Sequence, residues 1–328
     1  MTGPATAVAL TEAGESQSRE RRLGLLLGFL GVAAFSLSLP VTRRAVQEID
    51  ATFVAFGRMA LAGMAAAVLL ALRRAPFPAR HDLPALATVA GGVVLGFPLF
   101  STLAMREVDA SHGGVVLAIL PLATAAAGVL LAGERPSARF WAAAGSGGLL
   151  VLAFAFWRSR GAPGRADLYL LLACILCAAG YAAGGQLARR TPGLLVIAWA
   201  LVLTLPVSLT VAVLRWPAVD PAASPTAWLA FLYIALMSQF FGFYFWYGGL
   251  ARGGIARVGQ VQLLQTFLTL IASWALLGER VDPMAWLFAA GAVAAVWTAR
   301  SAPVSRRSQG AAASAPGTAA PSARARAR

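Results

Sequence analysis

Long apolar runs constrain this chain more than any other feature. Ten of them, 17 to 24 residues long, follow one another with short connections rich in Arg, Asp, Glu, Gly and Pro. About 20 apolar residues cross a bilayer as a helix, and lipid offers no partner to the backbone groups of an open chain. The sequence therefore predicts an all-α integral membrane protein with ten transmembrane helices. The predicted spans are Leu23–Val41, Thr52–Leu72, Leu83–Met105, His112–Ala132, Ala138–Trp157, Leu168–Leu187, Gly193–Leu214, Ala227–Leu250, Val258–Leu277 and Pro283–Ala299.

The composition agrees with a chain that meets lipid. The 328 residues are 59% hydrophobic and 12% charged, whereas a soluble domain averages about 25% charged residues. The net charge is +14, and all 27 basic residues are Arg. They form short clusters between the apolar runs, which is the pattern of topology signals and argues against a nucleic-acid partner. Abundant Ala without Lys is typical of a GC-rich bacterial genome, so we expect the bacterial inner membrane.

An internal repeat divides the chain into halves. Leu131-Ala132-Gly133-Glu134-Arg135 returns 145 residues later as Leu276-Leu277-Gly278-Glu279-Arg280, and a Trp follows seven positions after each Glu. A self-match at a fixed period indicates a duplicated unit. Five spans per copy place the two copies in opposite orientations. Inverted repeats of this kind build transporters, with a midplane site that opens alternately to each side.

The repeated residues also carry a family resemblance. An apolar run that ends in Gly-Glu-Arg in each half, together with Phe56-Gly57-Arg58, resembles the EamA family of the drug/metabolite transporter superfamily. The resemblance covers residues 23–300. It implies a transporter without cofactors that exports amino acids, related metabolites or drugs. The family pattern usually has Pro in both the fourth and the ninth span, and the second half departs from it with Thr266 where the first has Pro121.

The arginines also predict the orientation. One set of alternate segments, which includes both ends of the predicted bundle, carries 15 Arg, and the other set carries 8. The positive-inside rule then places both termini in the cytoplasm, although the connection 158–165 runs against the trend. Residues 1–18 and 301–328 are predicted as disordered tails. The repeats are predicted at 19–161 and 162–300.

Arg58 is a charge about seven residues inside the second predicted span. A charge at helix-centre depth costs about 2.5–3.5 kcal/mol on insertion scales, so Arg58 should face a watery cavity or an acidic partner. One interpretation is contact with an anionic group of a substrate, such as a carboxylate. The alternative is a structural Arg that reaches outward or pairs with acids of the same face. These acids are Glu48, Asp50, Glu107 and Asp109.

Other polar residues recur inside the predicted spans. The ninth span carries one stripe at helical spacing, which either lines a cavity for a polar substrate or bonds helices together. The eighth and sixth spans add four further candidates, whereas Trp246 and Tyr247 fit an interfacial belt. Ser36, Ser38 and Pro40 indicate a break in the first helix. The candidates for substrate binding are Arg58, Tyr181, Gln186, Gln239, Tyr244, Gln262, Gln265, Thr266 and Thr269.

The repeated motif is interpreted as structural. Gly133 and Glu134, like Gly278 and Glu279, stand where one span ends, so each Glu is expected to cap a helix or pair locally with the Arg that follows it. Cys174 and Cys177 are expected to be packing residues. His81 and His112 are assigned to different loops, which leaves no metal or catalytic cluster.

The sequence as a whole predicts a secondary membrane transporter. We expect an exporter of small polar or amphipathic metabolites, with a small-molecule substrate and the bilayer as partners and with the oligomeric state left open. No acid lies near a span centre, so proton coupling is unsupported and facilitated diffusion is equally open. The alternatives are a membrane sensor or assembly protein on a transporter-like scaffold and, more weakly, a membrane-embedded enzyme.

Overall fold

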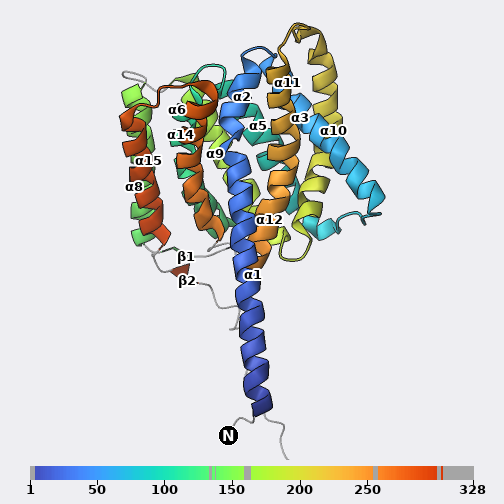
Figure 1. The fold of residues 1–328 in the computed structure, drawn as a ribbon, viewed down its shortest axis with the longest axis vertical. Coiled ribbons are helices and arrows are strands. Elements are labelled where there is room, and N and C mark those ends of the chain that lie inside the picture. The colour runs from blue at the N-terminus through green and yellow to red at the C-terminus, as the bar shows by residue number, and fades with distance from the viewer. Residues whose placement is uncertain are drawn as a thin grey trace, which may run out of the picture.

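The computed structural model is a bundle of helices (Figure 1). It describes residues 4–132, 135–136, 138–158, 164–253, 258–300 and 304–305. The first repeat contains α1 (Pro4–Ser36), α2 (Ser38–Val46), α3 (Ala51–Leu72), η1 (Arg80–Asp82), α4 (Leu83–Val89), η2 (Ala90–Gly96), α5 (Phe97–Ala104), α6 (Ala110–Val116), η3 (Leu117–Ile119), α7 (Leu120–Ala132) and α8 (Ala138–Arg158). The second contains α9 (Arg165–Leu187), α10 (Gly193–Arg215), η4 (Trp216–Ala218), α11 (Pro225–Leu232), η5 (Tyr233–Phe241), α12 (Gly242–Gly253), η6 (Gly259–Gln262), α14 (Leu263–Leu277) and α15 (Pro283–Arg300). Two short strands, β1 (Arg135–Pro136) and β2 (Val304–Ser305), pair antiparallel.

Seven helical stretches of the described chain are long and apolar enough to cross a membrane. They match the first four and the sixth, seventh and eighth predicted spans, which confirms an all-helical membrane protein. The helices α8, α14 and α15 occupy the other three predicted positions, but they are not among the seven, and α14 has only 15 residues. Seven of the ten predicted spans are therefore supported by length and composition, and the other three stay a prediction.

The helix α1 begins at Pro4, inside the stretch for which composition predicted a disordered tail. Ala and Glu are frequent in this stretch and are strong helix formers. The tail and its boundary at residue 18 stay a prediction.

The two repeats run in opposite directions. We call the end of the bundle with connections 47–50, 105–109 and 278–282 the upper face, which is at the top of Figure 1. The helix α1 rises toward this face. Its counterpart α9 starts there, where Arg165 pairs with Glu107, and descends to the lower face, where Arg190 pairs with Asp82. The duplicated unit is thus inverted.

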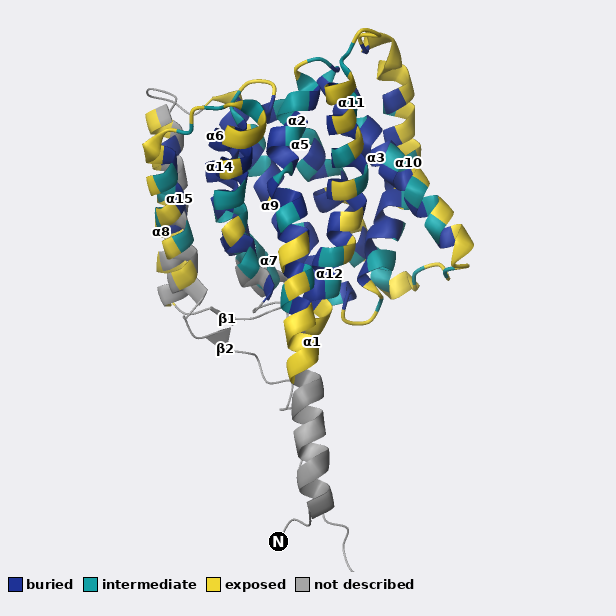
Figure 2. Ribbon diagram, viewed as in Figure 1, coloured by how far each residue is buried: buried dark blue, intermediate teal, exposed yellow. Residues whose placement is uncertain are grey.

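Helices of different repeats pack against each other throughout the bundle. The equivalent helices α3 and α10 form one contact, and α8 and α15 form another, while α1 packs on α12 and α7 on α9. Glycines allow the closest approach: a Cβ on Gly92 would lie 2.2 Å from the carbonyl oxygen of Leu176. The buried residues of both repeats join in shared cores between the helices, as the dark blue positions in Figure 2 show.

Each repeat contains a π-helix at the corresponding place. The segment η2 spans Ala90–Gly96 and η5 spans Tyr233–Phe241. A shift of 145 residues moves the first range onto 235–241, inside the second. Short π-helical segments occur frequently at functional sites, and both segments here line the cavity described next.

Candidate functional site between the repeats

Two small adjacent cavities lie between the repeats. Leu120 and Gln265 line both of them. Each has a volume of about 10 Å³ for the centre of a water-sized sphere, which is room for about one water molecule. A metabolite site usually needs about 300–1,000 Å³, so the structure represents a closed form of any such site.

Arg58 lies in the wall of the second cavity. Its side chain is 1% exposed, and Nη2 donates to Ser238 Oγ at 3.2 Å. Nε and Nη1 are buried and have no acceptor. A buried ion without its full set of partners is costly. The position therefore favours a ligand that supplies acceptors.

The acids that the sequence offered as partners of Arg58 are bound elsewhere. Each contacts another arginine of the upper face: Glu48 pairs with Arg44, Asp50 with Arg215, Glu107 with Arg165 and Asp109 with Arg43. A hydrogen bond from the Ser224 N–H and further bonds from Ser224 and Arg44 lower the pKa of Glu48 to about 2. The structural alternative for Arg58, pairing with these acids, is therefore wrong.

The predicted break in the first helix is present and has a chemical consequence. The chain leaves α-helical geometry at Leu37, between α1 and α2. Pro40 has no N–H to give to the carbonyl of Ser36, four residues earlier. Thr269 Oγ1 of the second repeat donates to that carbonyl at 2.9 Å. Next to the break, Ser38 and Ser238 share a hydrogen bond of 2.5 Å.

A second bond between the repeats also lies near a proline. Gln239 Nε2 donates to the carbonyl of Val94 in η2 at 3.4 Å, four residues before Pro98, which has no N–H. Gln239 is the repeat equivalent of Val94, at the shift of 145 residues. At both places, a second-repeat side chain donates to a first-repeat backbone carbonyl close to a proline.

Most of the predicted binding residues do line the cavities. The ninth-span stripe contributes Gln262, Gln265, Thr266 and Thr269 to the first cavity. The second cavity contains Arg58, Tyr181, Gln239 and Gln265 together with Ser38 and Ser238, which the prediction omitted. The buried atoms Gln262 Nε2 and Gln265 Oε1 have no partner, so the site retains one amide donor and one amide acceptor.

Two predicted residues do not belong to this site. Tyr244 is 44% exposed, whereas Trp246 and Tyr247, predicted as interfacial, are buried. Trp246 and Tyr247 follow buried Gln239 by seven and eight residues and so lie on the same helix face, whereas Tyr244 follows it by five and lies on another face. Gln186 is half-buried and lines neither cavity.

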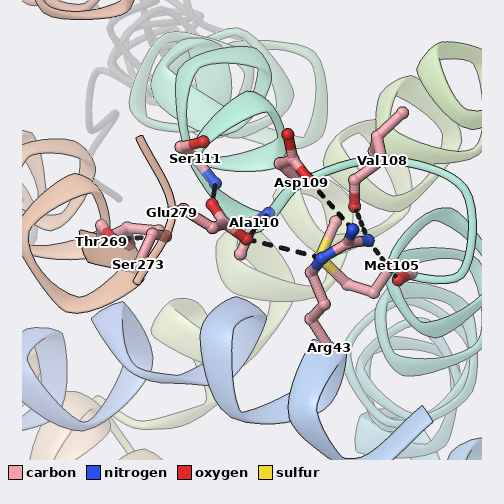
Figure 3. Close-up of polar contacts among 9 residues, drawn as sticks. All are labelled: Arg43, Met105, Val108, Asp109, Ala110, Ser111, Thr269, Ser273 and Glu279. Carbon is pink, nitrogen blue, oxygen red and sulfur yellow. Dashed lines mark hydrogen bonds and ion pairs between the residues drawn. The ribbon is translucent and has the colours of Figure 1, made fainter. Parts of the chain in front are cut away.

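The second copy of the repeated motif makes a long-range contact. Gly278 ends α14 with φ +65°, a left-handed conformation that glycine adopts readily. The chain turns there, and Glu279 accepts hydrogen bonds from the backbone N–H groups of Ala110 and Ser111 at 2.9 and 3.0 Å. Its ion pair is with Arg43, at 3.4 Å (Figure 3). The Glu thus caps another helix and pairs with a distant Arg instead of Arg280. Gly133 and Glu134 lie outside the described residues.

His112 is part of a helix and not of a loop. It is 4% exposed in the first turn of α6, and its Nε2 lies 2.6 Å from Oδ1 of Asp167 in α9. The sequence prediction assigned His112 to a loop because the polar residues at the start of this span gave no sign that the helix begins at Ala110. Cys174 and Cys177 are buried and free, as the packing interpretation predicted.

The fold defines a class: a helical membrane protein with two inverted repeats that enclose a polar site. The chain belongs to the EamA-like transporter family, whose model matches residues 22–157 and 164–300. It is 45% identical over 258 residues to the "Uncharacterized transporter YdeK" of Bacillus subtilis (strain 168), which covers 79% of this chain and 90% of that protein. A solved structure described as "Crystal structure of protein" has a TM-score of 0.57 at 20% identity, covering 84% of this chain and 97% of the other, and shares the fold. Family and relative identify a membrane transporter.

Proposed function

We propose that this protein is a secondary transporter that exports small metabolites, such as amino acids or related polar and amphipathic compounds, by alternating access. The observation that carries the proposal is Arg58, buried with two guanidinium nitrogens lacking acceptors, in a cavity between inverted repeats. Closing a site on such an ion is favourable only when a ligand provides the missing acceptors.

The proposed substrate carries a carboxylate next to uncharged polar atoms. Arg58 offers a rigid fork of donors, which matches a carboxylate. In the first cavity, Gln262 offers a free amide donor and Gln265 a free amide acceptor. Phe35, Phe97 and Phe243 add apolar walls to the second cavity, so the remainder of the substrate can be apolar or aromatic.

The proposed topology has ten spans in the bacterial inner membrane, with both termini in the cytoplasm. The helices α8, α14 and α15 then supply the three spans beyond the seven apolar ones, and the upper face is extracellular. The distribution of Arg supports this orientation, and the opposite directions of α1 and α9 agree with an odd number of spans in each repeat, as five is.

Transport is tested with purified protein in proteoliposomes. Vesicles are incubated with a pooled metabolite library, and the accumulated compounds are identified by mass spectrometry. We expect a small set of carboxylate-bearing compounds to enter, and empty vesicles provide the control. If no compound enters above that control while the protein remains folded, the transport function is wrong.

The second candidate is a sensor or assembly protein that uses the same scaffold. It would bind a ligand without moving it across the bilayer. Equilibrium binding without net flux in the same vesicles would favour it over transport. The polar residues in both cavities favour the transporter, because a scaffold has no need of unsatisfied amide and guanidinium groups inside its core.

A further inference from the structure

Two carboxylates of the second repeat hold three consecutive residues of the first. Glu279 accepts the backbone N–H groups of Ala110 and Ser111, and Asp167 lies 2.6 Å from the ring of His112. All three held residues belong to the first turn of α6. This turn is therefore fixed to both α9 and the end of α14.

Arg43 extends the contact to α2. Its guanidinium lies 3.4 Å from Glu279 and 2.9 Å from Asp109, and it donates to the carbonyl oxygens of Met105 and Val108 (Figure 3). The side chains of Arg43 and Glu279 are 21% and 10% exposed. Because water screens this pair less than a surface pair, its attraction is stronger.

The contact lies directly above the cavity. Gly114, one turn after the held residues of α6, lines the first cavity together with Thr269 of α14. A Cβ on Gly114 would lie 2.9 Å from the Thr269 side chain, so α6 and α14 touch at this level. Access from the upper face requires these two helices to separate, and Glu279 is the residue that joins them at their ends.

We propose that Glu279, Arg43 and the first turn of α6 form the gate of the upper face. The contact is made when that face is closed and is broken when the cavity opens toward it. The proposal rests on the transport function proposed above, since a gate has a role only in a protein that opens. Glutamate suits the position because its two oxygens accept two N–H groups and attract a cation together, whereas glutamine has one oxygen to offer.

The test measures how often the upper face opens. Ser273 of α14 is fully buried, one to two turns before Glu279. A Ser273→Cys reporter, in a Cys174→Ala/Cys177→Ala background, is labelled with a polar maleimide in nanodiscs, where the reagent reaches both faces. We expect Glu279→Gln to raise the labelling rate about tenfold or more, which corresponds to about 1.4 kcal/mol on the opening equilibrium. Arg43→Gln, which leaves the caps on Ala110 and Ser111, should raise it by a smaller factor.

Glu107→Gln is the matched control. Glu107 also pairs with an Arg of the other repeat at the upper face, but this pair, with Arg165, is 3.3 Å long and exposed. The control should leave the labelling rate unchanged. An equal rate for Glu279→Gln and the parent, with unchanged melting temperature, would overturn the gate. If the Glu279→Gln protein does not fold, the labelling rate of the Arg43→Gln protein is the test. A labelling rate equal to that of the parent would then overturn the gate as well.

The gate and the transport function can fail separately. Faster labelling of the Glu279→Gln protein, without substrate flux in proteoliposomes, would support the gate and contradict the transport function. Substrate flux without faster labelling would support the transport function and contradict the gate.

Discussion

At the residue scale, the candidate site is distinguished by unpartnered buried polar atoms that also line a cavity. Many Ser and Thr residues in the apolar runs make ordinary hydrogen bonds, as Thr204 does to the carbonyls of Ala200 and Leu201 in its own helix. Thr102, Trp246 and Tyr247 keep buried atoms without partners but line neither cavity. Arg58, Gln262 and Gln265 keep such atoms in the cavity walls, and we therefore expect a ligand there.

Replacing Arg58 by Ala should weaken binding of a carboxylate substrate about ten- to a hundredfold, because a charged hydrogen bond contributes about 1.5–3 kcal/mol. Affinity is measured on folded, purified protein with a pair of ligands that differ only in the carboxylate. The ligand without the carboxylate should lose much less affinity. An equal loss for both ligands would assign Arg58 a purely structural role.

Replacing Gln265 by Ala should have a smaller effect. A neutral hydrogen bond contributes about 0.5–1.5 kcal/mol, so affinity should fall about tenfold or less. The same ligand pair serves for the measurement. Gln186→Ala is the control, because this residue is an amide of the same repeat that lines neither cavity. A loss with Gln186→Ala as large as with Gln265→Ala would contradict the assigned site.

At the element scale, helix breaks in the first repeat are joined to side chains of the second. Thr269 and Gln239 donate to backbone carbonyls close to the proline of α2 and the proline of α5. These bonds couple the backbone geometry of one repeat to the position of the other. Irregular helices at membrane depth are tolerated where protein or a cavity surrounds them.

Thr269→Val should destabilise the protein by about 1–3 kcal/mol, because the buried Ser36 carbonyl loses its donor. Pro40→Ala restores an N–H that can bond to the same carbonyl, so Thr269→Val should cost less in that background. Melting temperatures of the four proteins give the coupling energy. Thr124→Val, the repeat equivalent, removes only a bond to the Leu120 carbonyl of its own helix and should show no coupling to Pro40→Ala.

Gly92→Ala should lower the melting temperature, and Gly91→Ala should not. A Cβ on Gly92 meets the Leu176 carbonyl at 2.2 Å, whereas one on Gly91 meets nothing within 4 Å. Overpacking of a close helix contact costs about 1–3 kcal/mol. The two adjacent substitutions are matched in chemistry, so equal effects on thermal stability would contradict the close packing of this segment on α9.

At the scale of the whole molecule, most of the described ion pairs between the repeats lie at the upper face. Arg43 with Glu279, His112 with Asp167, and Asp50 with Arg215 all join the two repeats there. Among the described residues of the lower face, Arg190 pairs with Asp82 and Arg252 with Glu20 through largely exposed arginines. The structure is therefore closed most firmly at its upper face.

The orientation predicts opposite compartments for two fusion sites. A reporter after Ser301 should report the cytoplasm, and one in the connection near Arg43 should report the outside. Alkaline phosphatase, active only outside, and a fluorescent protein, folded only inside, make the assignment. Identical compartments for both sites would contradict the predicted odd number of spans between them.

The sequence by itself determined the class of protein and the duplication. The length of the apolar runs dictated helices, because the bilayer leaves no alternative for the backbone, and the repeated Gly-Glu-Arg indicated two copies. The helix break near Pro40 and the polar stripe from Gln262 to Thr269 were also readable, since both depend on local chemistry and spacing. Only the tertiary structure decided what the polar groups contact. Tyr247 is buried in the bundle and Tyr244 is exposed, against the prediction from their depth in the span, and Glu279 contacts residues about 170 positions earlier in the chain. Such pairings depend on how the inverted repeats meet, and no local pattern of residues encodes the distance between two helix ends.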